Sequence, residues 1–211
     1  MKITSTNIAQ AKSITWNNKQ EKTGIFKEPT TEPIYLGKED VKGDEVSNRK
    51  VHGGEYKACY LFSLEQYPYW KNLYPNLDWK YGMFGENLTI SGLDETNLII
   101  GSIYEVGNAL IEITQPREPC YKFGLKFGDQ QVLKQFIEHG YPGTYVRVLK
   151  EGTVKKGDDL TLIKTPENRL TTFDFFKLLY SKNKDKDLLK LAVNNVAIPI
   201  EKRQKLSVFL K

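Results

Sequence analysis

Cysteine and histidine are scarce in this sequence of 211 residues, which contains two of each. Two cysteines, Cys59 and Cys120, do not form the disulfide framework that stabilises many small secreted domains. The sequence also has no Cys-x-x-Cys pair and no His-Glu-x-x-His motif, which are common in zinc proteins. These absences argue against a disulfide-stabilised domain and against a zinc enzyme of the usual types.

Long apolar runs are absent as well. No run approaches the roughly 18 residues that a membrane-spanning helix needs. Residues 1–7 lack the apolar segment of a secretory signal, so we expect a cytoplasmic protein and no membrane partner. With 39% hydrophobic and 27% charged residues, the composition is that of a globular protein with its own core.

The net charge of +5 comes from one part of the chain. Residues 165–211 hold ten of the 31 basic residues but only five of the 26 acidic ones, so residues 1–164 carry equal numbers of both signs. A neutral body with no pattern of alternating basic and aromatic residues does not predict a nucleic-acid partner. The basic segment is first interpreted as a solvated helix surface.

The body of the chain has the pattern of a β-rich protein. Short apolar or alternating segments that predict strands lie at residues 3–11, 58–62, 109–114, 145–149 and 160–163. Glycine-rich turns separate them, which is typical of a β-barrel or a β-sandwich. Helices are expected at residues 67–74 and 130–139.

After residue 165 the pattern becomes helical. Thr171 or Thr172 can cap a first helix, Asp185 can cap a second, and Pro199 can begin a third. We therefore predict a mainly β domain at residues 1–165 and a three-helix extension at residues 166–211.

Cys120 lies in a loop that favours a functional side chain. It follows residues 115–119 (Gln-Pro-Arg-Glu-Pro), directly after a predicted strand, and the two prolines stiffen the loop. Arg117 and Lys122 would favour the thiolate, whereas Glu118 would oppose it. A thiolate is a nucleophile or a ligand for a soft metal. These residues alone leave a buried, inert cysteine as the alternative, which is the role we expect for Cys59.

Two glycine-containing loops are further candidates. His52 precedes a pair of glycines that would allow the backbone to approach an anion, although an ordinary β-turn explains them equally. In the loop at residues 82–88, Glu86 and Asn87 could point into a site or satisfy the turn.

Taken together, the motifs resemble the MOSC family, the domain related to the C-terminal part of molybdenum-cofactor sulfurases. The segments that carry the resemblance lie at residues 22–24 (Lys-Thr-Gly), 41–44, 51–54 (Val-His-Gly-Gly), 84–89 (Phe-Gly-Glu-Asn-Leu-Thr), 92–93, 100–101, 115–120, 147–149 and 157–158. Their order and spacing are most similar to the YiiM subgroup, which is linked to resistance to N-hydroxylated purines and carries a C-terminal three-helix extension.

The resemblance implies a β-barrel that binds the molybdenum cofactor (molybdopterin) and not pyridoxal phosphate. It places the metal ligand and catalytic residue at Cys120. Residues in segments that line the cofactor pocket of the family are Lys22, Thr23, His52, Asn87, Arg117 and Arg147. Relatives that reduce amidoximes have Arg-Pro where this sequence has Gly85-Glu86, so the contacts on this side are expected to differ.

The resemblance implies a molybdenum-dependent reductase of N-hydroxylated compounds such as N-hydroxylaminopurines. The sequence has no flavin fingerprint, iron–sulfur cysteine set or haem motif, so a separate reductase, such as a flavoprotein, is expected to donate electrons. Two alternatives remain: a carrier of persulfide sulfur or of the cofactor, and a non-enzymatic binding domain. The basic segment at residues 165–211 would then be a solvated surface or a docking face for an acidic reductase.

Overall fold

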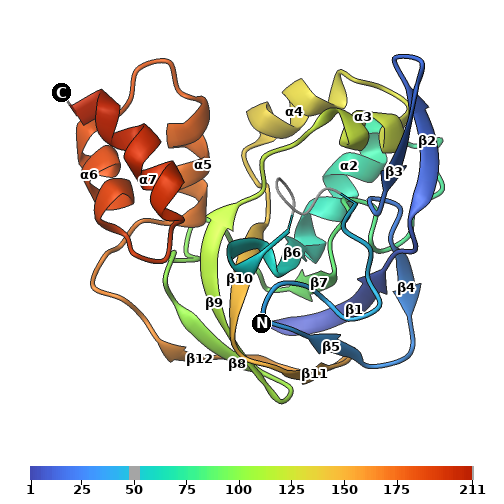
Figure 1. Cartoon of the computed structure of the whole chain (residues 1–211), viewed down its shortest axis with the longest axis horizontal. Coiled ribbons are helices and arrows are strands. Elements are labelled where there is room, and N and C mark those ends of the chain that lie inside the picture. Colours follow the sequence, from blue (N-terminus) through green and yellow to red (C-terminus); the bar gives the residue numbers. More distant parts are fainter. Residues whose placement is uncertain (48–52, 211) are drawn as a thin grey trace.

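The computed structural model describes residues 1–47 and 53–210. Within these residues the largest sheet has eight strands in the order β12-β8-β9-β10-β6-β7-β1-β4 (Figure 1). The neighbours pair antiparallel except for β6 and β7, which are parallel. The strands of this sheet are β1 (Lys2–Ile8), β4 (Glu28–Thr30), β6 (Cys59–Ser63), β7 (Leu88–Ser91), β8 (Ile103–Val106), β9 (Ala109–Pro116), β10 (Thr144–Lys150) and β12 (Leu160–Lys164).

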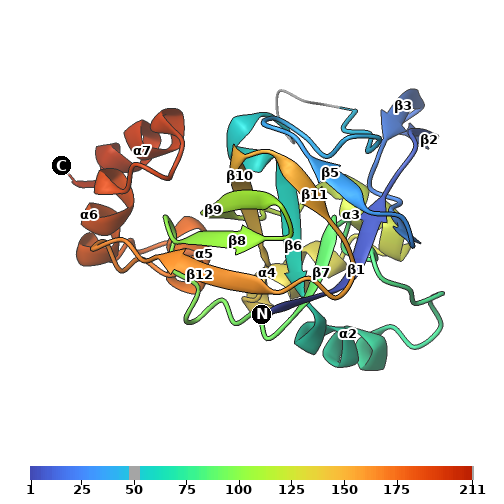
Figure 2. The ribbon, with the colours of Figure 1, turned by 90° about the horizontal axis from the view of Figure 1, so that it is seen from below.

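Two smaller pairings complete the β structure. They join β2 (Lys12–Trp16) to β3 (Lys19–Thr23) and β5 (Ile34–Leu36) to β11 (Gly152–Val154). The prediction of a closed barrel is not confirmed, because β12 and β4 are the two ends of the strand order and do not pair in the described part of the chain. An isolated bridge between Lys2 and Asp159 nevertheless brings the start of β1 beside the start of β12. The result is a curled sheet whose two edge strands, β12 and β4, do not pair with each other (Figure 2).

The predicted strands agree with the observed ones except at their ends. The first strand stops at Ile8 rather than at residue 11, because the backbone N–H of Ala9 leaves the sheet and donates to Asp44 Oδ1 at 2.8 Å. This early end matters for the site, since it ties the start of the chain to the segment that contains Asp44.

Two predicted helices are confirmed as α2 (Tyr67–Leu73) and α4 (Val132–His139). Pro68 stands in the first turn of α2, where its missing N–H costs no helical hydrogen bond. Gly140 ends α4 in the left-handed conformation, with φ at 83°. A further helix, α3 (Tyr121–Phe127), was not predicted; it is short and has a glycine in its middle, so its apolar periodicity is weak.

The three predicted C-terminal helices are present as α5 (Thr172–Tyr180), α6 (Lys186–Asn194) and α7 (Ile200–Ser207). Thr171 and Asp185 cap α5 and α6 through their side chains, as expected. The helices lie together on one side of the molecule (Figure 1), and α5 contacts α4 through the rings of Phe176 and Phe136, whose centroids are 6.3 Å apart. They share one hydrophobic cluster with the sheet, so the boundary at residues 165 and 166 stays a prediction. None of the helices in the described residues is long and apolar enough to cross a membrane.

The short 3-10 helices are η1 (Glu55–Lys57), η2 (Leu64–Gln66) and η3 (Val208–Leu210). A second hydrophobic cluster lies between the sheet and α2, α3 and α4, and it is mostly aromatic. Its fully buried members include Phe62, Trp70, Phe84, Phe123 and Phe136. Because Phe123 belongs to α3, this packing fixes the helix that begins directly after Cys120.

Candidate functional site

A cavity opens beside Cys120 where several distant segments meet. Its walls come from the residues after β3, from residues 44–47, from β6, from the loop before β7 and from the residues after β9. Of the predicted site residues, Cys120, Thr23, Asn87 and Arg117 line it. The fold therefore brings these four together, although they are far apart in the sequence.

Two predicted cofactor-binding residues do not line this cavity. The ammonium of Lys122 donates to the backbone carbonyl of Lys22 at 2.9 Å, so Lys22 contributes its backbone to the region beside the cavity. Arg147 pairs with Glu112, its direct neighbour on the adjacent strand β9. The guanidinium also lies 3.7 Å from Glu55 Oε1, so two carboxylates pair with it and it does not line the cavity. The sixth predicted residue, His52, lies outside the described residues.

Cys120 is partly exposed and adopts an extended backbone conformation directly before α3. Its backbone carbonyl accepts a hydrogen bond from Phe123 N at 2.8 Å, while its side chain makes no capping bond. The thiol is thus held on a fixed backbone and faces the cavity. Cys59, in contrast, is only 1% exposed, and burial raises the pKa of its thiol well above the ordinary range. The prediction that Cys59 is a core residue is confirmed.

Arg117 is a buried cation beside Cys120. Its guanidinium carbon lies 4.6 Å from the ring centroid of Phe123. The ring centroids of Tyr60 and Phe136 are 5.4 Å and 5.5 Å away. Burial opposes its charge, but Tyr60 and Tyr145 raise the pKa of Arg117 above its usual value. Its Nη1 has no hydrogen-bond partner in the described part of the chain. A buried donor without an acceptor is costly, so a ligand oxygen at this position would be stabilising.

Three lysines also line the cavity: Lys27, Lys57 and Lys122. The pKa of Lys57 is lowered, mainly because the side chain is buried and also because Lys202 is close. Lys122 lies two residues after Cys120, and its sequence position had already suggested that it favours the thiolate. Lys27 was missed, because nothing in its local sequence distinguishes it from a solvated lysine.

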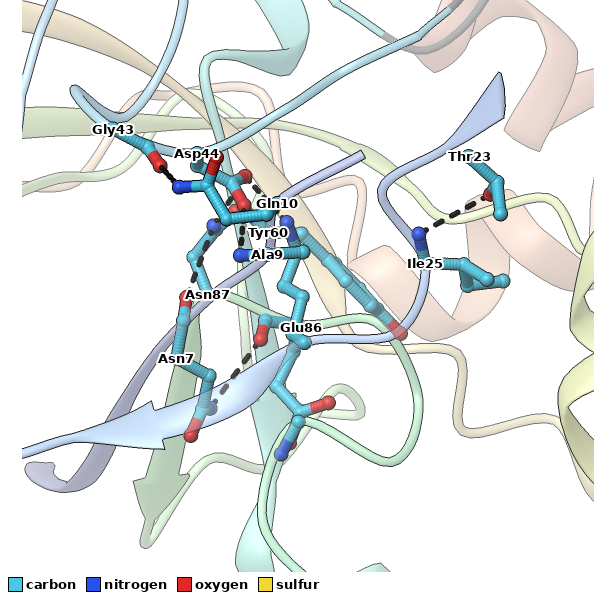
Figure 3. A network of polar contacts seen from close by, with 12 residues as sticks. Asn7, Ala9, Gln10, Thr23, Ile25, Gly43, Asp44, Tyr60, Glu86 and Asn87 are labelled. Atoms are coloured by element: carbon cyan, nitrogen blue, oxygen red, sulfur yellow. Dashed lines mark hydrogen bonds and ion pairs between the residues drawn. The ribbon is translucent and has the colours of Figure 1, made fainter. Parts of the chain in front are cut away.

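Asp44 also lines the cavity and joins several of its segments through hydrogen bonds (Figure 3). Its carboxylate accepts from Ala9 N at 2.8 Å, from Asn87 Nδ2 at 2.9 Å and from the ammonium of Lys27. Asn87 in turn accepts from Tyr60 N through Oδ1 at 3.2 Å. Hydrogen bonds thus lead from Lys27 through Asp44 and Asn87 to Tyr60. The ring of Tyr60 in turn contacts the guanidinium of Arg117.

The two polar residues of the loop before β7 have different roles. Glu86 is fully buried and its carboxylate satisfies the turn, since it accepts from Gly82 N (2.9 Å), Phe84 N (3.0 Å) and Thr89 Oγ1 (2.7 Å). Asn87 faces the cavity instead. The sequence had left open whether these residues satisfy the turn or point into a site; Glu86 does the first and Asn87 does the second.

The donor set limits the kind of metal that this cavity can hold. The described residues contain no group of three or more His, Cys, Asp or Glu side chains arranged to bind a metal ion. A metal at Cys120 would take one soft thiolate from these residues, and its other ligands would come from a cofactor or solvent. One thiolate beside several cations fits a soft metal carried by an anionic organic cofactor.

Comparisons with known proteins identify the family of this chain. Residues 48–161 match the family model of the MOSC domain. The chain is 31% identical to the uncharacterized protein YflK of Bacillus subtilis over 196 residues, which are 93% of this chain and 88% of YflK. A protein of Gibberella moniliformis named "Reductase" is 31% identical over 170 residues, which are 79% of this chain but 30% of the reductase.

Among solved structures, the crystal structure of YiiM from Geobacillus stearothermophilus is similar over the whole chain. The TM-score is 0.83 at 28% sequence identity, and the match covers 100% of this chain and 99% of YiiM. The resemblance to the MOSC family and to its YiiM subgroup is therefore confirmed.

Proposed function

Because the chain belongs to the MOSC family, we propose that it is a molybdenum-cofactor-dependent reductase of N-hydroxylated compounds, such as N-hydroxylaminopurines. One observation carries the proposal: the accessible thiol of Cys120 shares a cavity with the buried Arg117, whose Nη1 lacks a partner in the described residues. A thiolate is a suitable ligand for molybdenum, and an unpaired guanidinium donor suits the anionic part of a cofactor. The relative named "Reductase" and the similarity to YiiM support the proposal.

The residues of the cavity would have distinct tasks. Cys120 would hold the metal, while Arg117 would bind the anionic part of the cofactor and Thr23 and Asn87 would form the wall against it. When bound, the cofactor supplies the two electrons that convert an N–OH group and two protons into N–H and water. The rings of Tyr60 and Tyr145 would exclude water from this side of the cavity, because both are buried or partly buried there.

The remaining predicted residues receive weaker roles in this proposal. Arg147 would have to leave Glu112 before it could bind a ligand, and Lys22 would act through its backbone. His52 keeps its predicted role beside the cofactor, on the basis of its motif alone.

The proposal includes a separate electron donor, since the sequence has no flavin, iron–sulfur or haem motif. In the relative named "Reductase", the region similar to this chain makes up 30% of a longer protein. Such an arrangement is what we would expect if this kind of domain works with a redox partner.

The test compares metal content and turnover in three proteins produced with ample molybdate: the wild type, Cys120→Ala and, as a matched control, Cys59→Ala. We expect Cys120→Ala to lose bound molybdenum and N-hydroxylaminopurine reduction, and Cys59→Ala to keep both. Full activity in Cys120→Ala would contradict the proposal.

The same proteins test a second candidate function, a carrier of sulfur or of the cofactor, which the partly exposed Cys120 also permits. A carrier would show sulfane sulfur on Cys120, or release of the cofactor to another enzyme, without turnover of the N-hydroxylated substrate.

A further inference from the structure

A second cavity, which contains neither Cys120 nor Arg117, lies between residues 26–28, residues 77–83 and α3. Its volume is about 220 Å³, far more than the roughly 10–15 Å³ that one water molecule needs. The side chains of Phe26, Leu77 and Met83 provide apolar walls. The cavity therefore has room for a small molecule with an apolar part.

The charged side chains of this second cavity do not balance. Three lysines line it, and two of them have carboxylate partners: Lys27 pairs with Asp44, and Lys80 pairs with Glu28 at 2.7 Å. The third, Lys126 of α3, forms no ion pair with any carboxylate in the part of the chain that the structure describes. One cation of the cavity is thus without a counter-charge.

Backbone oxygens hold the amine of Lys126 in place. It donates to the carbonyls of Ile25 at 3.0 Å and of Gly82 at 2.5 Å, and its Nζ lies 6.0 Å from the ring centroid of Phe26. A lysine ammonium has three donors, so these two bonds leave one for an acceptor in the cavity. Burial lowers the pKa of Lys126 to about 7, which means that the folded protein lacks an anion at this position.

We infer that this second cavity binds a small carboxylic acid, whose carboxylate pairs with Lys126 and whose apolar part packs against Phe26, Leu77 and Met83. One surplus cation matches one negative charge. A phosphate monoester carries nearly two charges and would meet the carboxylates of Glu28 and Asp78 on the same walls, so a monoanion suits the cavity better. The inference is independent of the proposed function, because it involves a different cavity.

The charge on Lys126 couples this binding to pH. The charged groups that face Lys126 or share its cavity are Glu28, Asp78, Glu86, Lys27, Lys80 and Arg117. A bound carboxylate adds one more negative charge to this set, so it should raise the pKa of Lys126. Below pH 7 the amine is already protonated; above pH 7 it must take up a proton when the ligand binds. Affinity should therefore fall as the pH rises through 7.

The test measures binding of benzoate, and of the neutral benzamide, to the full chain without metal by isothermal titration calorimetry at low salt. Lys126→Met removes the charge, whereas Lys126→Arg keeps a cation that stays protonated at pH 6 and pH 8. Lys134→Met, in α4, is the matched control, since its side chain is 81% exposed and does not line the cavity.

We expect the wild type to bind benzoate at least about tenfold more tightly than benzamide at pH 6. Between pH 6 and pH 8 the benzoate affinity should fall about tenfold, because the protonated fraction of a group with a pKa of about 7 falls by that factor. Lys126→Met should bind benzoate at least about tenfold more weakly than the wild type at pH 6. Lys126→Arg should bind benzoate with the same affinity at both pH values, and Lys134→Met should behave as the wild type.

Three results would overturn the inference: no benzoate binding by the wild type, equal affinity for benzoate and benzamide, or unchanged benzoate binding in Lys126→Met. Benzoate binding that is lost in Arg117→Met but kept in Lys126→Met would place the anion in the Cys120 cavity and would also overturn it. Because neither molybdenum nor an N-hydroxylated substrate takes part, a failure of the proposed function would leave these results unchanged.

Discussion

The ammonium of Lys202, in α7, lies 2.5 Å from Glu118 Oε1, two residues before Cys120. Glu118 lines the cavity. This ion pair connects the C-terminal helices to the loop that carries the cysteine, and it neutralises a negative charge at the edge of a cavity that otherwise contains several cations. The extension therefore influences the electrostatics of the site without lining the cavity.

Removing this cation should weaken anion binding. In Lys202→Ala the carboxylate of Glu118 keeps its charge near the anionic cofactor that we propose, so we expect the protein to retain about two- to tenfold less molybdenum. The double variant with Glu118→Gln should recover the molybdenum content, as measured by elemental analysis. If the double variant retains as little molybdenum as Lys202→Ala, the charge of Glu118 is not the cause. The ion pair is partly exposed, so the free energy of unfolding should fall by less than about 1 kcal/mol.

The basic C-terminal helices lead to a prediction about the electron donor. If residues 165–211 form the docking face for an acidic reductase, turnover coupled to that protein should fall as salt screens the attraction. Turnover with a small chemical reductant, such as dithionite, should not change in the same range of salt. An equal response of the two reactions would leave the helices with a solubilising role alone.

Glu95 should make stability depend on pH. It is fully buried, its Oε1 accepts from Gly143 N at 3.0 Å, and its Oε2 has no partner among the described residues. Burial raises the pKa of this carboxyl to about 7. A raised pKa means that the folded state favours the protonated form, so this contribution is complete below the ordinary pKa of about 4.5 and is lost as the pH rises through 7.

Glu95→Gln, which stays neutral, should therefore gain stability over the wild type as the pH rises. We expect the difference in the free energy of unfolding to grow by about 2–3 kcal/mol between pH 4.5 and pH 8, as measured with urea. The control is Glu105→Gln, at an exposed position of β8, which should show no such growth. A difference that does not depend on pH would refute a raised pKa at Glu95.

Gly24 is predicted to be essential for the shape of the cavity. A Cβ atom at this position would lie 1.8 Å from the backbone oxygen of Glu45, so the two cavity-lining segments could not stay in place. Gly24→Ala should lower the free energy of unfolding by roughly 2 kcal/mol or more and reduce the molybdenum content. Gly43→Ala is a suitable comparison, because its Cβ would meet nothing within 4 Å and only its positive φ of 81° adds cost, about 1 kcal/mol. Equal losses in the two variants would argue against the steric explanation.

Local sequence signals predicted much of the fold. Thr171 and Asp185 were recognised as helix caps because capping depends on residues within one turn. The helix after Cys120 was missed, since its seven residues are held by aromatic packing more than by their own propensity. The β-barrel was not confirmed, because the pairing between edge strands is not a local property of either strand.

The sequence by itself determined the family of this protein, through an ordered set of motifs, and it identified Cys120 in a stiff loop beside Arg117. The tertiary structure decided which side chains share a cavity with that cysteine. It brought in Lys27, which carries no local signal, as the partner of Asp44, and it paired Arg147 with Glu112 across the β9–β10 ladder. The physical reason is that strand register and packing join segments far apart in the chain, so the partner of a buried charge depends on the whole fold and not on its neighbours in sequence.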